Sequence, residues 1–175
     1  MKVIPKPQDG EFAPYTRMYI DLLPDDGRVL EHMQVNLQQI VDLVTDQPDT
    51  FLSEPHAPGE WTIKQILVHV VDDERIYAYR ALRVARGDQT ELPGFDQDAF
   101  AISSDANNRS LDSILREYRA VRESTIAMFD SFDNVMLLRS GISDGKVMSV
   151  RAAAYHIAGH ELHHLYSIKS NYFQG

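Results

Sequence analysis

The stretch Gly159–His164 reads GHELHH and places two histidines, His160 and His164, four residues apart near the end of the chain. In a helix, residues at i and i+4 lie on one face, so these two imidazoles can bind the same metal ion. At about 100° per residue, several apolar residues share their arc: Val150, Ala153, Ile157 and Ile168. Burying two imidazoles without partners is costly. A bound metal ion would explain why the pair lies on the apolar face.

Outward from this stretch, apolar residues recur with helical periodicity in four segments. We expect these helices at about 27–45, 62–86, 110–132 and 149–172. The second has the clearest ends, because Thr62 and Gln65 form a capping box and Gly87 follows the last periodic residue. Four helices of similar length, each with one apolar face, predict an all-α fold, a four-helix bundle. We expect a single domain over residues 1–175.

The connections at 88–109 and 133–148 are longer than usual bundle loops, which suggests local structure or a function within them. Asp144 and Gly145 lie between Ile142 and Val147, a pattern typical of a short hairpin turn. Convincing strands are otherwise too few for a fold built on a sheet.

Composition excludes several classes of protein. The 175 residues contain no cysteine, so disulfides, thiolate metal sites and a cysteine nucleophile are ruled out. A net charge of −9 argues against binding to nucleic acid or to an anionic membrane, since both require basic patches. No segment has the apolar run of a signal peptide or of a membrane span. We therefore expect a cytoplasmic protein.

Two histidines on one helix make a weak site, so a third ligand is needed, and His69 is the best candidate. It lies among apolar residues of the second helix, which can face the fourth in a bundle. A lone histidine there would be interpreted as a core-edge residue, but the pair at His160 and His164 reverses that preference. His156 lies one turn before His160 and could extend the column, but it lies well off the centre of the apolar arc, and His163 points about 100° away from it.

The remaining polar candidates stay open or are set aside. Asp73, one turn after His69, could be a fourth ligand, could orient an imidazole, or could pair with an arginine such as Arg80. His32 and His56 have no partner motif. Trp61 is interpreted as a core anchor at the start of the second helix.

The stretch His160–His164 also matches the H-E-x-x-H motif of metalloproteases, with Glu161 as the general base. The longer forms of the motif fail, because the residues after His164 supply neither the required glycine and histidine nor a downstream acidic ligand. A protease is therefore disfavoured. We interpret Glu161 as a flank residue that meets solvent, and a role as a base beside a bound water stays open.

Two stretches together resemble the DinB/YfiT-like metalloproteins: 59–69, which reads GEWTIKQILVH, and 155–164, which reads YHIAGHELHH. The resemblance implies an up-down-down-up four-helix bundle that holds zinc or nickel, with iron as a further candidate, through His69, His160 and His164. It also implies a homodimer that acts on a small molecule. Some family members use a low-molecular-weight thiol such as bacillithiol or mycothiol.

Three functions are compatible with these residues. A metal ion with open positions activates a bound thiol or water, which predicts either a thiol S-transferase or a hydrolase. The third alternative is a metal-binding stress protein without activity. The transferase is the first expectation, and because the chain has no cysteine, its thiol must come from a cosubstrate. Arg80, Arg83 and Arg151 are candidates to attract an acidic thiol. No residue is assigned a catalytic role.

Overall fold

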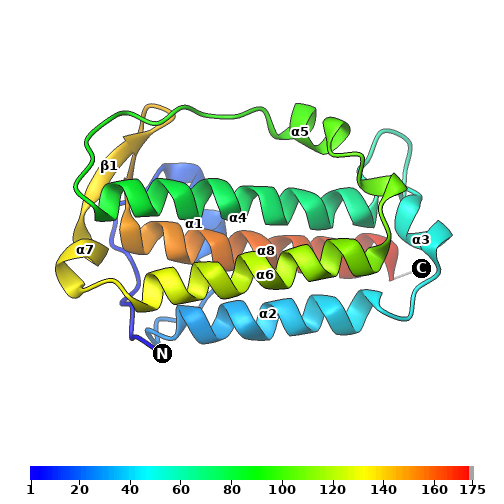
Figure 1. The fold of residues 1–175 in the computed structure, drawn as a ribbon, viewed down its shortest axis with the longest axis horizontal. Helices are drawn as coiled ribbons and strands as arrows, with labels where there is room; N and C mark the ends of the chain where they lie inside the picture. The colour runs from blue at the N-terminus through cyan, green and yellow to red at the C-terminus, as the bar shows by residue number, and fades with distance from the viewer. Residues whose placement is uncertain (174–175) are drawn as a thin grey trace.

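The computed structural model describes residues 1–173, and four long helices form its body (Figure 1). They are α2 (Val29–Val44), α4 (Ile63–Ala85), α6 (Leu111–Asp130) and α8 (Val150–Tyr172). The predicted all-α bundle is confirmed. Following the colours in Figure 1, α2 and α8 run in one direction and α4 and α6 run in the opposite one. This is the up-down-down-up order that the family resemblance implies.

Side-chain caps fix where three of these helices begin. Thr62 and Gln65 form the predicted capping box at α4, in which the side chain of each binds the backbone N–H of the other. Ser110 caps α6 and Ser149 caps α8 through one hydrogen bond each. In both, the serine hydroxyl accepts from the backbone N–H three residues on. Such caps satisfy N–H groups that have no partner within the helix.

The two long connections contain short elements that periodicity did not reveal. Between α4 and α6, the chain runs back along the bundle and forms α5 (Gln97–Ser103) and the 3₁₀ turn η2 (Ala106–Asn108) (Figure 1). Because α4 and α6 are parallel, this connection has to span the length of the bundle. Between α6 and α8 lie α7 (Asn134–Leu138) and the strands β1 (Ser140–Ser143) and β2 (Lys146–Ser149).

The predicted hairpin is confirmed. β1 and β2 pair antiparallel, with Ile142 opposite Val147. Asp144 and Gly145 have φ values of 52° and 68°, so both turn residues adopt the left-handed conformation that a tight two-residue hairpin requires. Leu92 of the long crossover adds to the hairpin, because its N–H donates to the Ile142 carbonyl and its own carbonyl accepts from Asp144 N–H. The crossover is thereby held against the hairpin.

The first residues pack on the central helix. The 3₁₀ turn η1 (Pro14–Thr16) leads into α1 (Arg17–Ile20), and the short α3 (Asp49–Ser53) connects α2 to α4. At the contact of α1 with α8, a side chain at Gly159 would collide with the backbone of Tyr19. Glycine at 159 therefore allows α1 to lie directly on the helix that carries His160.

One expectation about α8 is wrong. The sequence predicts a single apolar face, yet the helix is buried all round from Ala152 to Leu162. The cause is that α1, α2 and α4 all pack against it, so polar residues in this part of α8 are buried as well. Within residues 1–173, no helix combines the length and the apolar character needed to cross a membrane.

Candidate metal centre

Three imidazoles from two helices converge in the bundle. His69 comes from α4, and His160 and His164 come from successive turns of α8. The Nε2 atom of His160 lies 3.1 Å from Nε2 of His69 and 3.1 Å from Nε2 of His164. His69 and His160 are buried, and His164 is partly exposed. The structure thus brings together the three histidines that the sequence analysis selected.

The spacing of these atoms fits one small divalent ion. Nitrogens bound tetrahedrally to zinc at about 2.0–2.1 Å would lie roughly 3.3 Å apart, close to the separations between these imidazoles. Burial lowers the pKa of His69, lowers that of His160 to about 3, and holds that of His164 well below its usual value. All three rings are therefore neutral at pH 7, which is the protonation state that binds a metal.

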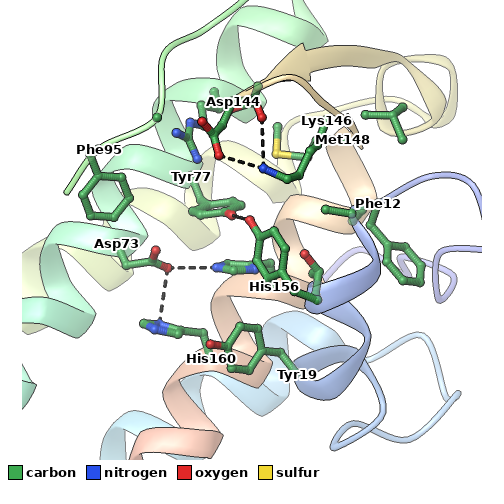
Figure 2. A pocket seen from close by; sticks show the side chains of 18 of the residues that line it. Phe12, Tyr19, Asp73, Tyr77, Phe95, Asp144, Lys146, Met148, His156 and His160 are labelled. Atoms are coloured by element: carbon green, nitrogen blue, oxygen red, sulfur yellow. Dashed lines mark hydrogen bonds and ion pairs between the residues drawn. The ribbon is translucent and has the colours of Figure 1, made fainter. Parts of the chain in front are cut away.

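Asp73 contacts the rings of His160 and His156 and so fixes their orientation. Its Oδ2 lies 3.3 Å from Nδ1 of His160 and 3.1 Å from Nε2 of His156 (Figure 2). Burial alone would raise the pKa of Asp73, but the adjacent His160 and His156 outweigh it and hold the pKa well below its usual value. A carboxylate this close to Nδ1 of His160 favours the tautomer with its proton on Nδ1, which leaves Nε2 of that ring free to bind a metal. Of the three roles left open for Asp73, the geometry favours orienting an imidazole.

His156 is the site residue that the sequence analysis ranked too low. It is buried, its ring stacks on Tyr77 at 3.6 Å between centroids, and it lies beside His160 at 5.5 Å. Among the described residues, no partner forms a hydrogen bond with its Nδ1 atom. The helical wheel set His156 aside because it lies off the apolar arc, but α8 has no exposed side at this position. Its i, i+4 relation to His160 was the signal available in the sequence.

Glu161 requires a correction, because it neither meets solvent nor approaches the imidazole cluster. Its carboxylate is fully buried, accepts a hydrogen bond from the Tyr118 hydroxyl and forms an ion pair with Arg122 at 2.9 Å. Arg122 also pairs with Glu74 at 2.8 Å. Burial raises the pKa of Glu161. Glu161, which occupies the general-base position of the H-E-x-x-H pattern, thus belongs to a separate ionic cluster that it forms with residues of α6.

Of the remaining histidines, His32 and His56 have other partners, whereas the ring of His163 lies 5.3 Å from that of His164. His32 contacts Asp26 at 3.0 Å, and His56 packs against the ring of Tyr172. His163 is partly exposed and meets the edge of Tyr19. Trp61, expected to be a core anchor only, lies 4.8 Å from the ring of His69 and lines a cavity of about 120 Å³ together with His164.

A larger cavity of about 190 Å³ opens beside His160. In Figure 2, His160 and Asp73 lie at one end of this cavity, Asp144 and Lys146 lie at the other, and Tyr77 lies between them. Other residues of its wall are Phe12, Tyr15, Tyr19, Arg80, Phe95 and His156. Of the three imidazoles only His160 lines this cavity, so a small molecule bound in it would lie beside His160.

Of the three arginines considered for an acidic ligand, only Arg80 lines this cavity. Arg83 pairs with Asp88, and Arg151 binds Glu11 through Nε at 2.7 Å. These two charges are neutralised by carboxylates of the chain itself.

Comparisons with known proteins give matches over most of the chain. The DinB superfamily model matches residues 31–168. A protein of Oceanobacillus iheyensis, named as a candidate metal-dependent hydrolase, is 27% identical over 143 residues, covering 80% of this chain and 81% of that protein. YfiT from Bacillus subtilis, described as a candidate metal-dependent hydrolase with an unusual four-helix bundle topology, has a TM-score of 0.73. It is 17% identical, and the match covers 94% of this chain and 90% of YfiT, which shows a shared fold.

Proposed function

The chain belongs to the DinB superfamily, and from this premise we propose that it is a metal-dependent hydrolase of small molecules. The observation that carries the proposal is the convergence of three neutral imidazoles next to a cavity that reaches His160. The names of the Oceanobacillus iheyensis and Bacillus subtilis proteins support the same reaction class.

In this proposal His69, His160 and His164 hold one divalent ion, and zinc or nickel suits a set of nitrogen ligands. An ion held by three imidazoles, once bound, supplies an activated water and polarises a carbonyl or phosphoryl oxygen. Asp73 keeps the His160 ring in the tautomer and orientation that binding requires. The rest of the chemistry depends on residues of the cavity wall.

We assign the proton transfer to His156 together with Asp73. His156 lines the cavity, and its Nε2 contacts the Asp73 carboxylate at 3.1 Å. Nδ1 of His156 has no hydrogen-bond partner among the described residues, so we assign this atom to accept a proton from water and return it to a leaving group, while Asp73 holds Nε2. Glu161 cannot take this role, since Arg122 and Tyr118 hold its carboxylate on the α6 side of α8.

The test is hydrolysis of chromogenic esters and amides by protein depleted of metal and then loaded with zinc, nickel or iron. We expect turnover that chelators abolish and that the correct ion restores. His156→Gln should lower kcat by roughly 100-fold or more without loss of bound metal. His32→Gln, a substitution outside the cluster, should leave both kcat and the metal content unchanged. Absence of turnover with every ion and substrate class would contradict the hydrolase assignment.

A thiol S-transferase is the second candidate function, and one observation favours it. Arg80 places a cation on the wall of the cavity, where an acidic thiol cosubstrate would need one. The distinguishing assay follows consumption of bacillithiol, mycothiol or glutathione with monochlorobimane by the same metal-loaded protein. Metal-dependent thiol consumption without hydrolysis would replace the hydrolase with the transferase. If chelation lowers the melting temperature and neither activity exists, the ion is structural.

A further inference from the structure

Arg80 is a buried charge that forms no ion pair with a carboxylate among residues 1–173. Its side chain projects from α4 into the wall of the larger cavity, and only 5% of the residue is exposed. Among the described residues, the Pro93 carbonyl is its one hydrogen-bond acceptor, at 2.7 Å from NH2. A guanidinium carries five N–H donors, and a buried charge without a partner is costly. Most of the hydrogen-bonding capacity of Arg80 is thus unused.

The contacts of Arg80 position the guanidinium without neutralising it. Its central carbon lies 5.0 Å from the centre of the Tyr77 ring and 6.0 Å from that of Phe95. Aromatic rings attract a cation through their faces and leave the N–H groups at its edge free for other partners. Tyr77 is itself held by the Tyr15 hydroxyl at 3.0 Å and by the ring of His156.

The acidic groups of the cavity wall are already paired with other residues. Asp144 lies on the same cavity wall, but its carboxylate forms its ion pair with Lys146 at 2.9 Å. Figure 2 shows this pair at the end of the cavity away from His160. Asp73, at the other end, is engaged by His156 and His160. Both carboxylates of the cavity are therefore bound to other residues of the chain.

We propose that Arg80 anchors a terminal carboxylate of the substrate, so that the enzyme acts on elongated small molecules with an anionic group at one end. Arg80 lies seven residues after Asp73 on α4, a rise of about 10 Å along the helix. Its long side chain points back toward the start of the helix. The bound anion would therefore lie roughly 7–10 Å from the end of the cavity that Asp73 and His160 form. A planar guanidinium binds a carboxylate through two parallel hydrogen bonds. This inference rests on the proposed function for the reaction at His160, but not for the anion site.

The experiment measures binding, which does not depend on turnover. Glutarate, adipate, suberate and azelate are titrated calorimetrically into zinc-loaded protein, each beside the monocarboxylate of the same chain length. We expect the best dicarboxylate to bind roughly tenfold to hundredfold more tightly than its monocarboxylate, the usual gain from a hydrogen-bonded charge pair. In Arg80→Gln this ratio should fall to about one. A terminal phosphonate in the same series shows whether a doubly charged anion fits the site better.

Matched variants keep the result interpretable. Arg83→Gln removes a cation of the same helix that is already paired with Asp88, and it should retain the full preference. Asp144→Asn should strengthen dicarboxylate binding, because it removes a negative charge beside Arg80. Arg80→Lys retains the charge if Arg80→Gln does not fold, and it should keep part of the preference. A ratio near one in the wild type, or an equal ratio in the wild type and the Arg80 variants, overturns the inference. A retained preference in protein that hydrolyses nothing would reject the hydrolase and leave the anion site standing.

Discussion

Two buried polar clusters lie on opposite sides of the α4–α8 contact, and neighbouring residues supply them. Asp73 and His160 face the cavity, whereas the next residues, Glu74 and Glu161, form ion pairs with Arg122. One step along a helix turns a side chain by about 100°, so consecutive positions reach different surroundings. The same two helices thus carry a candidate metal site and an internal ionic cluster side by side.

The difference between the clusters is whether the chain alone satisfies them. Arg122 binds both oxygens of Glu74, one oxygen of Glu161 and the Met33 carbonyl, so most of its donors are used. The three imidazoles instead direct nitrogen atoms at one another, and the single lone pair that Nε2 of His160 can offer is shared between His69 and His164. The first cluster stabilises the fold, and the second is the candidate site for an ion. Substitutions should separate these two roles.

The largest expected effect is on stability, from Arg122→Met. This substitution leaves Glu74 and Glu161 buried without their cation, and the free energy of unfolding should fall by about 3–5 kcal/mol. Urea denaturation at constant metal concentration measures the change. Arg75→Met breaks a partly exposed pair with Glu117 and should cost less than about 1 kcal/mol. Similar losses in the two variants would contradict the structural role of the ionic cluster.

Asp73→Asn should act on the metal rather than on the fold. Without the carboxylate behind His160, affinity for the ion should fall by roughly 10- to 100-fold, as measured by competition with a chelator. Asp72→Asn is the matched control, because Asp72 lies one residue earlier and pairs with Arg75 at 3.6 Å. Equal affinities in the two variants would show that Asp73 does not support the site.

Acid should destabilise the metal-free protein through His160. Burial lowers its pKa to about 3 from a usual value of 6.5, so between these values the unfolded chain binds more protons than the folded one. The stabilising contribution is full above about pH 6.5 and is lost as the pH falls toward 3. Thermal unfolding between pH 7.5 and 4.5 should show a steeper loss in the wild type than in His160→Gln. Parallel curves would contradict a neutral, buried imidazole at this position.

The smallest effect on stability is expected from the N-terminal cap of α8. This helix carries residues of both clusters. Ser149→Ala removes the cap from the Ala152 N–H and should cost about 1 kcal/mol of stability. Metal content should not change, because the cap lies more than two turns from His160. Chemical denaturation and elemental analysis of the same preparation test both statements. A loss of metal in this variant would mean that the site depends on the whole helix, not on its own residues.

The part of the site predicted from sequence followed from helical spacing, from the apolar surroundings of His69 and from the family resemblance. His160 and His164 are one turn apart, and His69 is the histidine on a facing helix, so helical geometry and bundle packing were enough to select them. The long helices were predictable for the same reason. The short α5 and α7 were not, because five to seven residues are too few to show a period.

The errors at His156 and Glu161 have one physical cause. A helical wheel assumes that a helix has one buried side, and α8 is buried all round over this stretch. A residue off the apolar arc then meets another helix instead of water: His156 meets Asp73 of α4, and Glu161 meets Arg122 of α6. Tertiary packing decides which residue such a side chain contacts, and the pattern of apolar residues along one helix does not contain that information.

The most direct test compares the metal content of three proteins by inductively coupled plasma mass spectrometry: wild type, His160→Ala and Glu161→Gln. These variants alter neighbouring residues that belong to different clusters. We expect about one divalent ion per chain in the wild type and in Glu161→Gln, and almost none in His160→Ala. Equal metal content in the two variants, or no metal in the wild type after loading, would contradict the assignment of the three histidines.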